Sequence, residues 1–501
     1  MGTDRMQALG RGRPPRQART SPGGHGRQRT APTTQGTGLS VVRDPLRILL
    51  FLLTVITISR VHSYIGLAAL RPAFMLVVLT GAYALLNPRT LHQSSFLRTW
   101  PARLMAALGL MACISVPFGM SIGGSGAFIL NTYGKVLLYA FLLVVAIRHV
   151  RDLYTFVWAY VVSSGILIIL AVVVVGVSKT RGLNAYDAND LGLVLLVGLP
   201  LALVVFQSTD SRLIKLFSGG TVAGIGMAMA LSMSRGGFLG SLAVGLGLLF
   251  LLKGVSVAKR LAFVALAAVT LVVAAPAGYW DLMRTILTPT EDYNWQNDYG
   301  RRQVWERGLG YMMGNPLTGI GIGNFGRAEG TISEPAVDFD PVRSRIKWSV
   351  AHNSFLETGA EMGIPGLILF SSLVFGGMAA MVRLRKRLPP GWARGDPQER
   401  FLFHMALYMP VSLLAFAVTG FFVSFAYQDP VYILAAFMAG LYAAVEVKMR
   451  NNRMVGGHTP VPRPPRWRVR VPEERLPYPV PAARSTRVSA EAHRERVPPI
   501  R

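Results

Sequence analysis

Charge and sulfur are both scarce in this chain. Only 15% of its 501 residues are charged, against roughly 25% in soluble domains, and 51% are hydrophobic. The single cysteine, Cys113, excludes an internal disulfide and a zinc or iron–sulfur site built from cysteines, and its apolar surroundings predict a small buried hydrophobe. The sequence also lacks a Gly-Lys-Ser/Thr phosphate loop, a His-Glu-x-x-His pair and a Gly-x-Ser-x-Gly elbow.

Apolar runs of about twenty residues take the place of those features, and each is long enough to cross a bilayer as a helix. They predict an all-α polytopic membrane protein with about twelve transmembrane helices. The predicted spans are 46–59, 72–86, 104–118, 133–147, 153–177, 190–206, 213–232, 236–252, 261–278, 364–382, 402–423 and 430–447.

Acidic residues are outnumbered, with 25 Asp and Glu against 52 Lys and Arg and a net charge of +27. Much of the excess lies in residues 1–45 and 448–501, whose polar, Pro-containing composition predicts disordered tails. We attribute this charge to membrane topology and attraction to anionic membrane lipids, and we expect no nucleic-acid partner.

The basic residues between the spans also predict the orientation of the chain. With the N-terminus inside, the basic clusters that separate the spans fall on the cytoplasmic side of a bacterial inner membrane, as the positive-inside rule requires. Both termini are then cytoplasmic. Residues 46–278 carry nine predicted helices, residues 279–352 form one large extracytoplasmic loop, and residues 353–447 carry three more helices.

The loop is too long to be a plain connection, because structureless loops of this length are uncommon unless they are functional. Within it, Trp305, Leu309, Met312 and Met313 recur at helical spacing. They predict an amphipathic helix that lies against the membrane or the helix bundle.

Three basic positions and a histidine map to the outer face. Arg235 lies between two predicted spans, Arg301 and Arg302 begin the predicted loop helix, and His352 lies where the chain re-enters the membrane. Guanidinium groups suit phosphate oxygens, and a histidine can accept a proton near neutral pH. Adjacent helical residues point about 100° apart, so we expect only one arginine of the pair to face the bundle.

Other polar residues at this face are candidates for substrate binding. Asn189 and Asp190 begin a predicted span, where they would either bind sugar hydroxyls or cap the helix, and capping is the simpler interpretation. Asn353 and Glu357 follow His352, and Glu361 shares a helix face with Glu357. No metal site and no cofactor are expected.

Five short motifs in this order resemble those of the O-antigen ligase and O-antigen polymerase superfamily of bacterial membrane glycan transferases. They are Ser234-Arg235-Gly236-Gly237, Gly300-Arg301-x-x-x-Trp305, Asn315-Pro316-Leu317-Thr318-Gly319-Ile320-Gly321-x-Gly323-Asn324-Phe325, Ala351-His352-Asn353-Ser354-Phe355-Leu356-Glu357 and Glu361-x-Gly363-Ile364-Pro365-Gly366. The resemblance covers roughly residues 46–447.

The resemblance implies a GT-C-type helical fold, a polyprenyl-diphosphate-linked glycan donor and transfer to a hydroxyl of a glycan or lipid acceptor without a metal or cofactor. It implies that Arg235 and Arg301 hold the donor diphosphate, with Arg302 able to substitute, and that His352 is the base. The motifs do not separate a polymerase for O-antigen or exopolysaccharide, which we favour slightly, from a ligase that passes the glycan to a lipid core or a protein.

Two further alternatives have less support. A transporter or flippase would place charges near the bilayer midplane, whereas the charged candidates here lie at one face. A GT-C enzyme that moves single sugars would carry a carboxylate in its first outer loop, and residues 60–71 contain no Asp or Glu.

Overall fold

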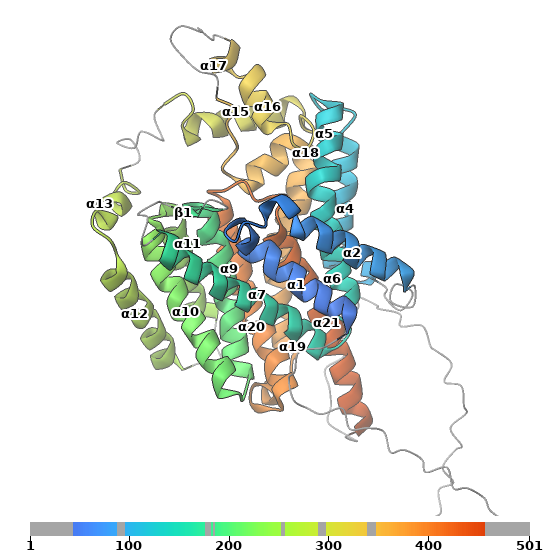
Figure 1. The fold of residues 1–501 in the computed structure, drawn as a ribbon, viewed down its shortest axis with the longest axis vertical. Coiled ribbons are helices and arrows are strands. Elements are labelled where there is room, and N and C mark those ends of the chain that lie inside the picture. The colour runs from blue at the N-terminus through green and yellow to red at the C-terminus, as the bar shows by residue number, and fades with distance from the viewer. Residues whose placement is uncertain are drawn as a thin grey trace, which may run out of the picture.

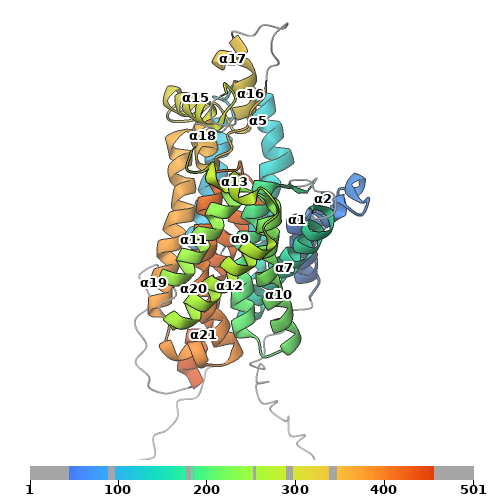
Figure 2. The same ribbon diagram turned by 90° about the vertical axis from the view of Figure 1, so that its left-hand side faces the viewer.

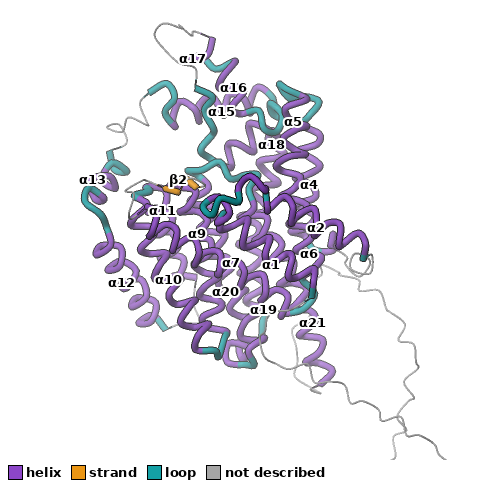
Figure 3. The backbone as a smooth tube through the Cα atoms, in the orientation of Figure 1, coloured by secondary structure: helices purple, strands orange, loops and turns teal. Residues whose placement is uncertain are grey.

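The computed structural model describes residues 44–87, 96–175, 182–183, 186–251, 256–288, 297–337 and 347–455. The predicted tails lie outside these residues, apart from a few positions next to the first and last helices. Long helices stand side by side along the long axis of the molecule, and short helices α15, α16 and α17 gather at one end (Figures 1 and 2). In the tube view, the described residues form helices joined by loops and turns, together with one short pair of strands (Figure 3).

The α-helices are α1 (Pro45–Ser59), α2 (Pro72–Leu86), α4 (Trp100–Ser115), α5 (Ile122–Phe128), α6 (Gly134–Ala146), α7 (Val150–Leu170), α9 (Ala188–Ser208), α10 (Arg212–Ser232), α11 (Arg235–Leu251), α12 (Val257–Ala274), α13 (Tyr279–Arg284), α15 (Arg301–Gly314), α16 (Phe325–Thr331), α17 (Glu334–Val337), α18 (Ser354–Ser371), α19 (Gly377–Arg387), α20 (Pro397–Gly420) and α21 (Asp429–Val455). The 3₁₀ segments are η1 (Val61–Ser63), η2 (Ala68–Leu70), η3 (Phe96–Arg98) and η8 (Pro390–Arg394), and the π-helical segments are η4 (Ile129–Tyr133), η5 (Ala171–Val175) and η7 (Ser372–Gly376). Strands β1 (Gly182–Leu183) and β2 (Tyr186–Asp187) pair antiparallel just before α9.

The chain is an all-α membrane protein. Within the described residues, eight helical stretches are long and apolar enough to cross a bilayer, and three shorter apolar helices accompany them. The eight are 68–86, 122–146, 150–173, 188–208, 212–232, 354–387, 397–420 and 429–452. Each of the twelve predicted spans overlaps a helix.

Helices α9, α20 and α21 form the centre of the bundle, where each is buried along most of its length. Their sequences are apolar on all faces, which is typical of a helix enclosed by others. The peripheral helices α2 and α10 bury only a minority of their residues, and the rest of their apolar surface faces outward.

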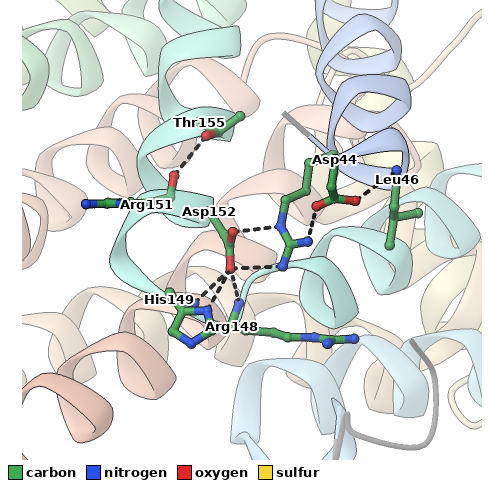
Figure 4. A network of polar contacts seen from close by, with 8 residues as sticks. Asp44, Leu46, Arg148, His149, Arg151, Asp152 and Thr155 are labelled. Carbon is green, nitrogen blue, oxygen red and sulfur yellow. Dashed lines mark hydrogen bonds and ion pairs between the residues drawn. The ribbon is translucent and has the colours of Figure 1, made fainter. Parts of the chain in front are cut away.

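A buried ion pair joins the first turns of α1 and α7. Arg47 contacts Asp44 and pairs with Asp152 at 2.6 Å between Nε and Oδ1. Asp152 also accepts the backbone N–H groups of Arg148 and His149 at 2.9 Å each (Figure 4). A buried carboxylate without partners would destabilise the fold, and these bonds offset the cost of burying Asp152. They also fix the junction of α1 and α7 in one arrangement.

Helix α18 is broken at Gly363, whose φ of 69° is left-handed. A side chain there would clash, because a Cβ would lie 2.6 Å from the carbonyl oxygen of Pro316. The predicted span 364–382 begins directly after this break. Residues 354–362 therefore form a separate short helix at the end of the bundle that carries α15.

Two sequence expectations are corrected. Cys113 was expected to be buried, but it is exposed on α4, where an apolar side chain on the outer face of a membrane helix needs no protein partner. Helix α21 continues to Val455, eight residues beyond the predicted end of its span. The helix begins in the bundle core and carries its polar last turns, including Lys448, past it.

Candidate functional site

The turn of residues 421–428, which joins α20 to α21, forms the floor of the candidate site. It receives contacts from three segments that are far apart in the sequence. Phe422 lies against Gly236 and beneath the guanidinium of Arg301, while Ser424 accepts the backbone N–H of His352. The turn thus brings together the segments around Arg235, Arg301 and His352.

The backbone of His352 is held in a left-handed conformation with φ of 47°, which is uncommon for a residue other than glycine. The Ser424 hydroxyl accepts its N–H at 3.0 Å, and the carbonyl of the preceding Ala351 accepts the indole N–H of Trp305 at 3.0 Å. Bonds from α15 and from the 421–428 turn therefore fix this strained position from both sides.

Burial, followed by the positive charge of Arg301, lowers the pKa of His352 from its ordinary value of 6.5 to about 4. Asp187 acts in the opposite direction, and Lys347 adds to the lowering. The imidazole is consequently neutral at physiological pH, which is the state that accepts a proton.

The two adjacent arginines of α15 point in different directions. Arg301 faces inward, with its guanidinium carbon 5.8 Å from the centre of the Phe422 ring. Arg302 lies on the surface and pairs with Glu306 at 2.9 Å. Of the two, only Arg301 adjoins His352, in agreement with the expectation that one of the pair would face the bundle.

Arg235 begins α11 at the same end of the bundle. Its guanidinium donates to the hydroxyl of Thr285 at 3.0 Å, close to the end of α13. The preceding Ser234 donates to the side-chain oxygen of Asn189 at 2.6 Å and accepts the N–H of Gly237 at 2.8 Å. A Cβ at Gly236 would lie 3.2 Å from Phe422, so glycine lets this turn rest on the floor of the site.

The polar start of α9 includes a helix cap, but the capping side chain is that of Asp187 and not that of Asn189 or Asp190. Asp187 accepts the backbone N–H groups of Asn189 and Asp190, and Asn189 also supports the Ser234 turn. The carboxylate of Asp190 interacts electrostatically with Arg60, which lies over the ring of Tyr186 at 4.1 Å. The neighbouring Asn184 lies outside the described residues.

The remaining candidates on α18 have structural partners. Asn353 is the N-cap, and its side-chain oxygen accepts the N–H groups of Phe355 and Leu356 at 3.0 and 3.1 Å. Glu357 faces the 421–428 turn, where Ala426 donates to it at 3.4 Å. Both residues therefore position α18 against the floor of the site, one helical turn from His352.

Glu361 is buried, and its side chain binds the glycine-rich segment that precedes α16. Its two carboxylate oxygens accept the N–H groups of Gly323 and Phe325, each at 2.8 Å. Gly319 has a left-handed φ of 66°, and a Cβ there would lie 2.3 Å from the backbone of Glu361. Gly319 thus allows this loop to pack against α18.

Helix α15 confirms the amphipathic helix that was predicted in the loop, but the buried stripe is displaced from the predicted one. Val304, Gly308 and Met312 pack inward, whereas Leu309 and Met313 are exposed. Beside this stripe lies an apolar cavity of about 380 Å³ between α15 and α18. It is lined by Trp305, Leu309, Met312, Asn353, Phe355, Leu356, Leu367, Ser371, Phe375 and Phe421.

Sequence reasoning missed the importance of residues 421–428 and of Arg60. The Phe and Ser residues of this turn carry no chemical signature in the sequence. Arg60 donates to Gln428 at 3.5 Å and has a left-handed φ of 47°. A basic residue in an otherwise apolar outer segment was the one signal that pointed to it.

Comparison with known proteins places one segment in a family. Residues 220–371 match the family model described as O-antigen ligase, which confirms the resemblance recognised from the motifs. No curated protein matches the chain. The matched segment contains Arg235, Arg301 and His352, whereas the start of α9 and the 421–428 turn lie outside it.

Proposed function

We propose that this chain, with an O-antigen ligase segment at residues 220–371, is a membrane enzyme that transfers a lipid-linked glycan onto an acceptor hydroxyl. The donor that we propose is a polyprenyl-diphosphate-linked oligosaccharide or polysaccharide, and the transfer takes place at the extracytoplasmic face. The GT-C-type fold and the absence of a metal or cofactor requirement remain predictions of the family resemblance.

The observation that carries the proposal is the convergence of three segments on Phe422 and Ser424. Gly236 and Arg301 both contact Phe422, and the backbone of His352 is bonded to Ser424. Two arginine-bearing segments and a neutral imidazole therefore share one floor. This combination supports a reaction in which an anion is stabilised and a proton is removed.

In the proposed reaction, His352 takes the proton of the acceptor hydroxyl. The hydroxyl oxygen then bonds to the anomeric carbon of the donor sugar, and the bond from that carbon to the diphosphate oxygen breaks. Arg235 and Arg301 stabilise the negative charge that develops on the departing diphosphate. Arg302 has no part in this scheme because it pairs with Glu306 on the surface.

We further propose that the apolar cavity between α15 and α18 receives the first isoprenyl units of the donor lipid. Trp305 lies one helical turn after Arg301, and Asn353 follows His352, so the cavity begins directly beside the reacting groups. Its lining is almost entirely apolar, which suits a hydrocarbon chain.

The test compares Arg301→Ala with Arg302→Ala, because the two residues are adjacent and have the same charge. In cells that lack the gene, each variant is expressed and the surface glycan is quantified. We expect Arg301→Ala to reduce transfer about a hundredfold, the scale of losing one transition-state donor, and Arg302→Ala to leave it near wild type. Equal effects of the two substitutions would contradict the assignment of Arg301.

The same strain separates the two candidate reactions. We favour a polymerase for O-antigen or exopolysaccharide, for which single repeat units should accumulate on the polyprenyl carrier when the gene is absent. A ligase would instead leave full-length chains stranded on the carrier. A normal glycan profile in the deletion strain would argue against both enzymes and favour a transporter.

A further inference from the structure

A second cavity, of about 350 Å³, opens at the other end of the bundle between α4, α19 and α21. The α18–α19 stretch runs from Ser354, two residues after His352, to Arg387 at this cavity. Arg383 follows Ile364 by 19 positions, which rise roughly 28 Å as a helix. This rise is close to the thickness of the hydrocarbon core of a bilayer, roughly 30 Å.

One face of α19, together with the π-helical turn before it, forms a wall of the cavity. The residues along this wall change from small to positively charged. Gly376, Ala380, Arg383 and Arg387 follow one another at intervals of three and four residues, so they lie on one helix face. A Cβ added to Gly376 would meet nothing within 4 Å. The wall therefore has an open, small-residue part toward the membrane interior and two guanidinium groups at its end.

Arg383 and Arg387 differ from the neighbouring Arg385 and Lys386 because they line the cavity. None of the ion pairs within the described residues includes Arg383 or Arg387. Arg385 turns away and lies over the ring of Phe403 at 3.7 Å. Lys386, on the same helix turn, does not line the cavity.

Aromatic residues complete the site at the level of the arginines. Trp100 and Tyr442 line the cavity from α4 and α21, and the Tyr442 hydroxyl donates to the carbonyl of Ala380 at 3.5 Å. Trp and Tyr concentrate where lipid headgroups meet the hydrocarbon. The cavity thus joins an apolar slot, an aromatic rim and two arginines that form no ion pair with a described carboxylate.

We propose that this cavity binds an anionic phospholipid of the adjacent leaflet. The headgroup phosphate lies between Arg383 and Arg387, whose planar donors suit phosphate oxygens, and an acyl chain lies along Gly376 and Ala380. Basic pockets between membrane helices bind anionic lipids in this way. The proposal concerns the end of the bundle remote from His352, and it does not depend on the proposed glycan transfer.

The test measures the melting temperature of the full chain, purified in detergent and depleted of lipid. Phosphatidylglycerol is titrated in parallel with phosphatidylcholine of the same acyl chains and with inorganic phosphate. We expect only phosphatidylglycerol to raise the melting temperature. The Arg383→Gln/Arg387→Gln variant should need roughly thirtyfold more of it, and the matched Lys386→Gln/Arg394→Gln variant should respond as wild type does.

A second pair of variants leaves the arginines in place. Gly376→Leu fills the open part of the cavity and should abolish the response, whereas Gly220→Leu, at an exposed glycine of α10 with equal open space, should not. Three results would each overturn the proposal. The first is that the Arg383→Gln/Arg387→Gln variant and the Lys386→Gln/Arg394→Gln variant respond equally to phosphatidylglycerol. The others are an unaltered response in Gly376→Leu, or a response of the wild type to inorganic phosphate that equals its response to phosphatidylglycerol.

Discussion

At the scale of single residues, the protonation state of His352 governs the proposed chemistry. The imidazole lies beside Arg301, and burial and this charge both favour its neutral form. A histidine with an ordinary pKa of 6.5 would be partly protonated in mildly acidic surroundings, and it would then be unable to act as a base. Arg301 therefore acts on the proposed base as well as on the proposed donor.

This arrangement predicts the pH dependence of transfer. With the pKa of His352 at about 4, kcat/KM should stay constant between pH 5 and 7 as far as this group is concerned, and fall below about pH 4 as the imidazole becomes protonated. In Arg301→Ala, the lost positive charge should raise the pKa, so the acidic limb of the remaining activity moves to higher pH. Initial rates measured from pH 3.5 to 8 in purified enzyme test this shift.

Arg302→Ala is the control for the pH profile, because the guanidinium of Arg302 lies on the surface and pairs with Glu306. Its acidic limb should coincide with that of the wild type. An acidic limb near pH 6.5 in the wild type, or one that does not move in Arg301→Ala, would contradict the proposed coupling between the arginine and the histidine.

At the scale of elements, α15 presents two neighbouring exposed apolar residues with different surroundings. Leu309 lines the cavity against α18, whereas Met313, one turn later, does not. Leu309→Trp should fill part of the proposed lipid slot and raise the KM for the lipid-linked donor about tenfold, while Met313→Trp should leave it unchanged. Donor titrations with both purified variants measure the difference, and equal KM values would contradict the slot.

At the junction of α1 and α7, we expect a substitution to lower the stability of the protein without lowering its catalytic rate. Asp152→Asn would remove the buried carboxylate of this network and leave Asp44 as the acidic partner of Arg47, which should cost about 2 kcal/mol. The junction lies at the end of the bundle remote from His352, so kcat should not change. Asp210→Asn is the control: its exposed pair with Arg400 should contribute less than about 1 kcal/mol. Denaturation in detergent micelles compares them, and equal losses would contradict the buried-pair argument.

Hydropathy located the helices of this fold because long apolar runs are a local property of the sequence. The break at Gly363 and the buried stripe of α15 were not predicted, because each depends on what packs against it: the backbone around Pro316 in one case and α18 in the other. The floor of the site escaped prediction for the same reason. Phe422 and Ser424 matter through their contacts with distant segments, which a single sequence does not reveal.

At the scale of the whole molecule, the two ends of the bundle carry different groups. One end holds His352, Arg301 and the 421–428 turn, and the other holds Arg383, Arg387 and the ion pair between Arg400 and Asp210. The positive-inside rule assigns the second end to the cytoplasm, which would put the proposed reaction on the extracytoplasmic side. The side of the membrane on which the proposed transfer takes place therefore depends on this assignment.

The single native cysteine makes the orientation directly testable. Because Cys113 is exposed and would itself react, it is first replaced by alanine, and the Cys113→Ala protein serves as the background. Two exposed positions then receive a cysteine each: Glu306→Cys on α15 and Gly391→Cys between α19 and α20. A membrane-impermeant maleimide should label Glu306→Cys in intact cells and label Gly391→Cys only after the membrane is permeabilised. The reverse pattern would place His352 in the cytoplasm, where the proposed extracytoplasmic transfer could not take place.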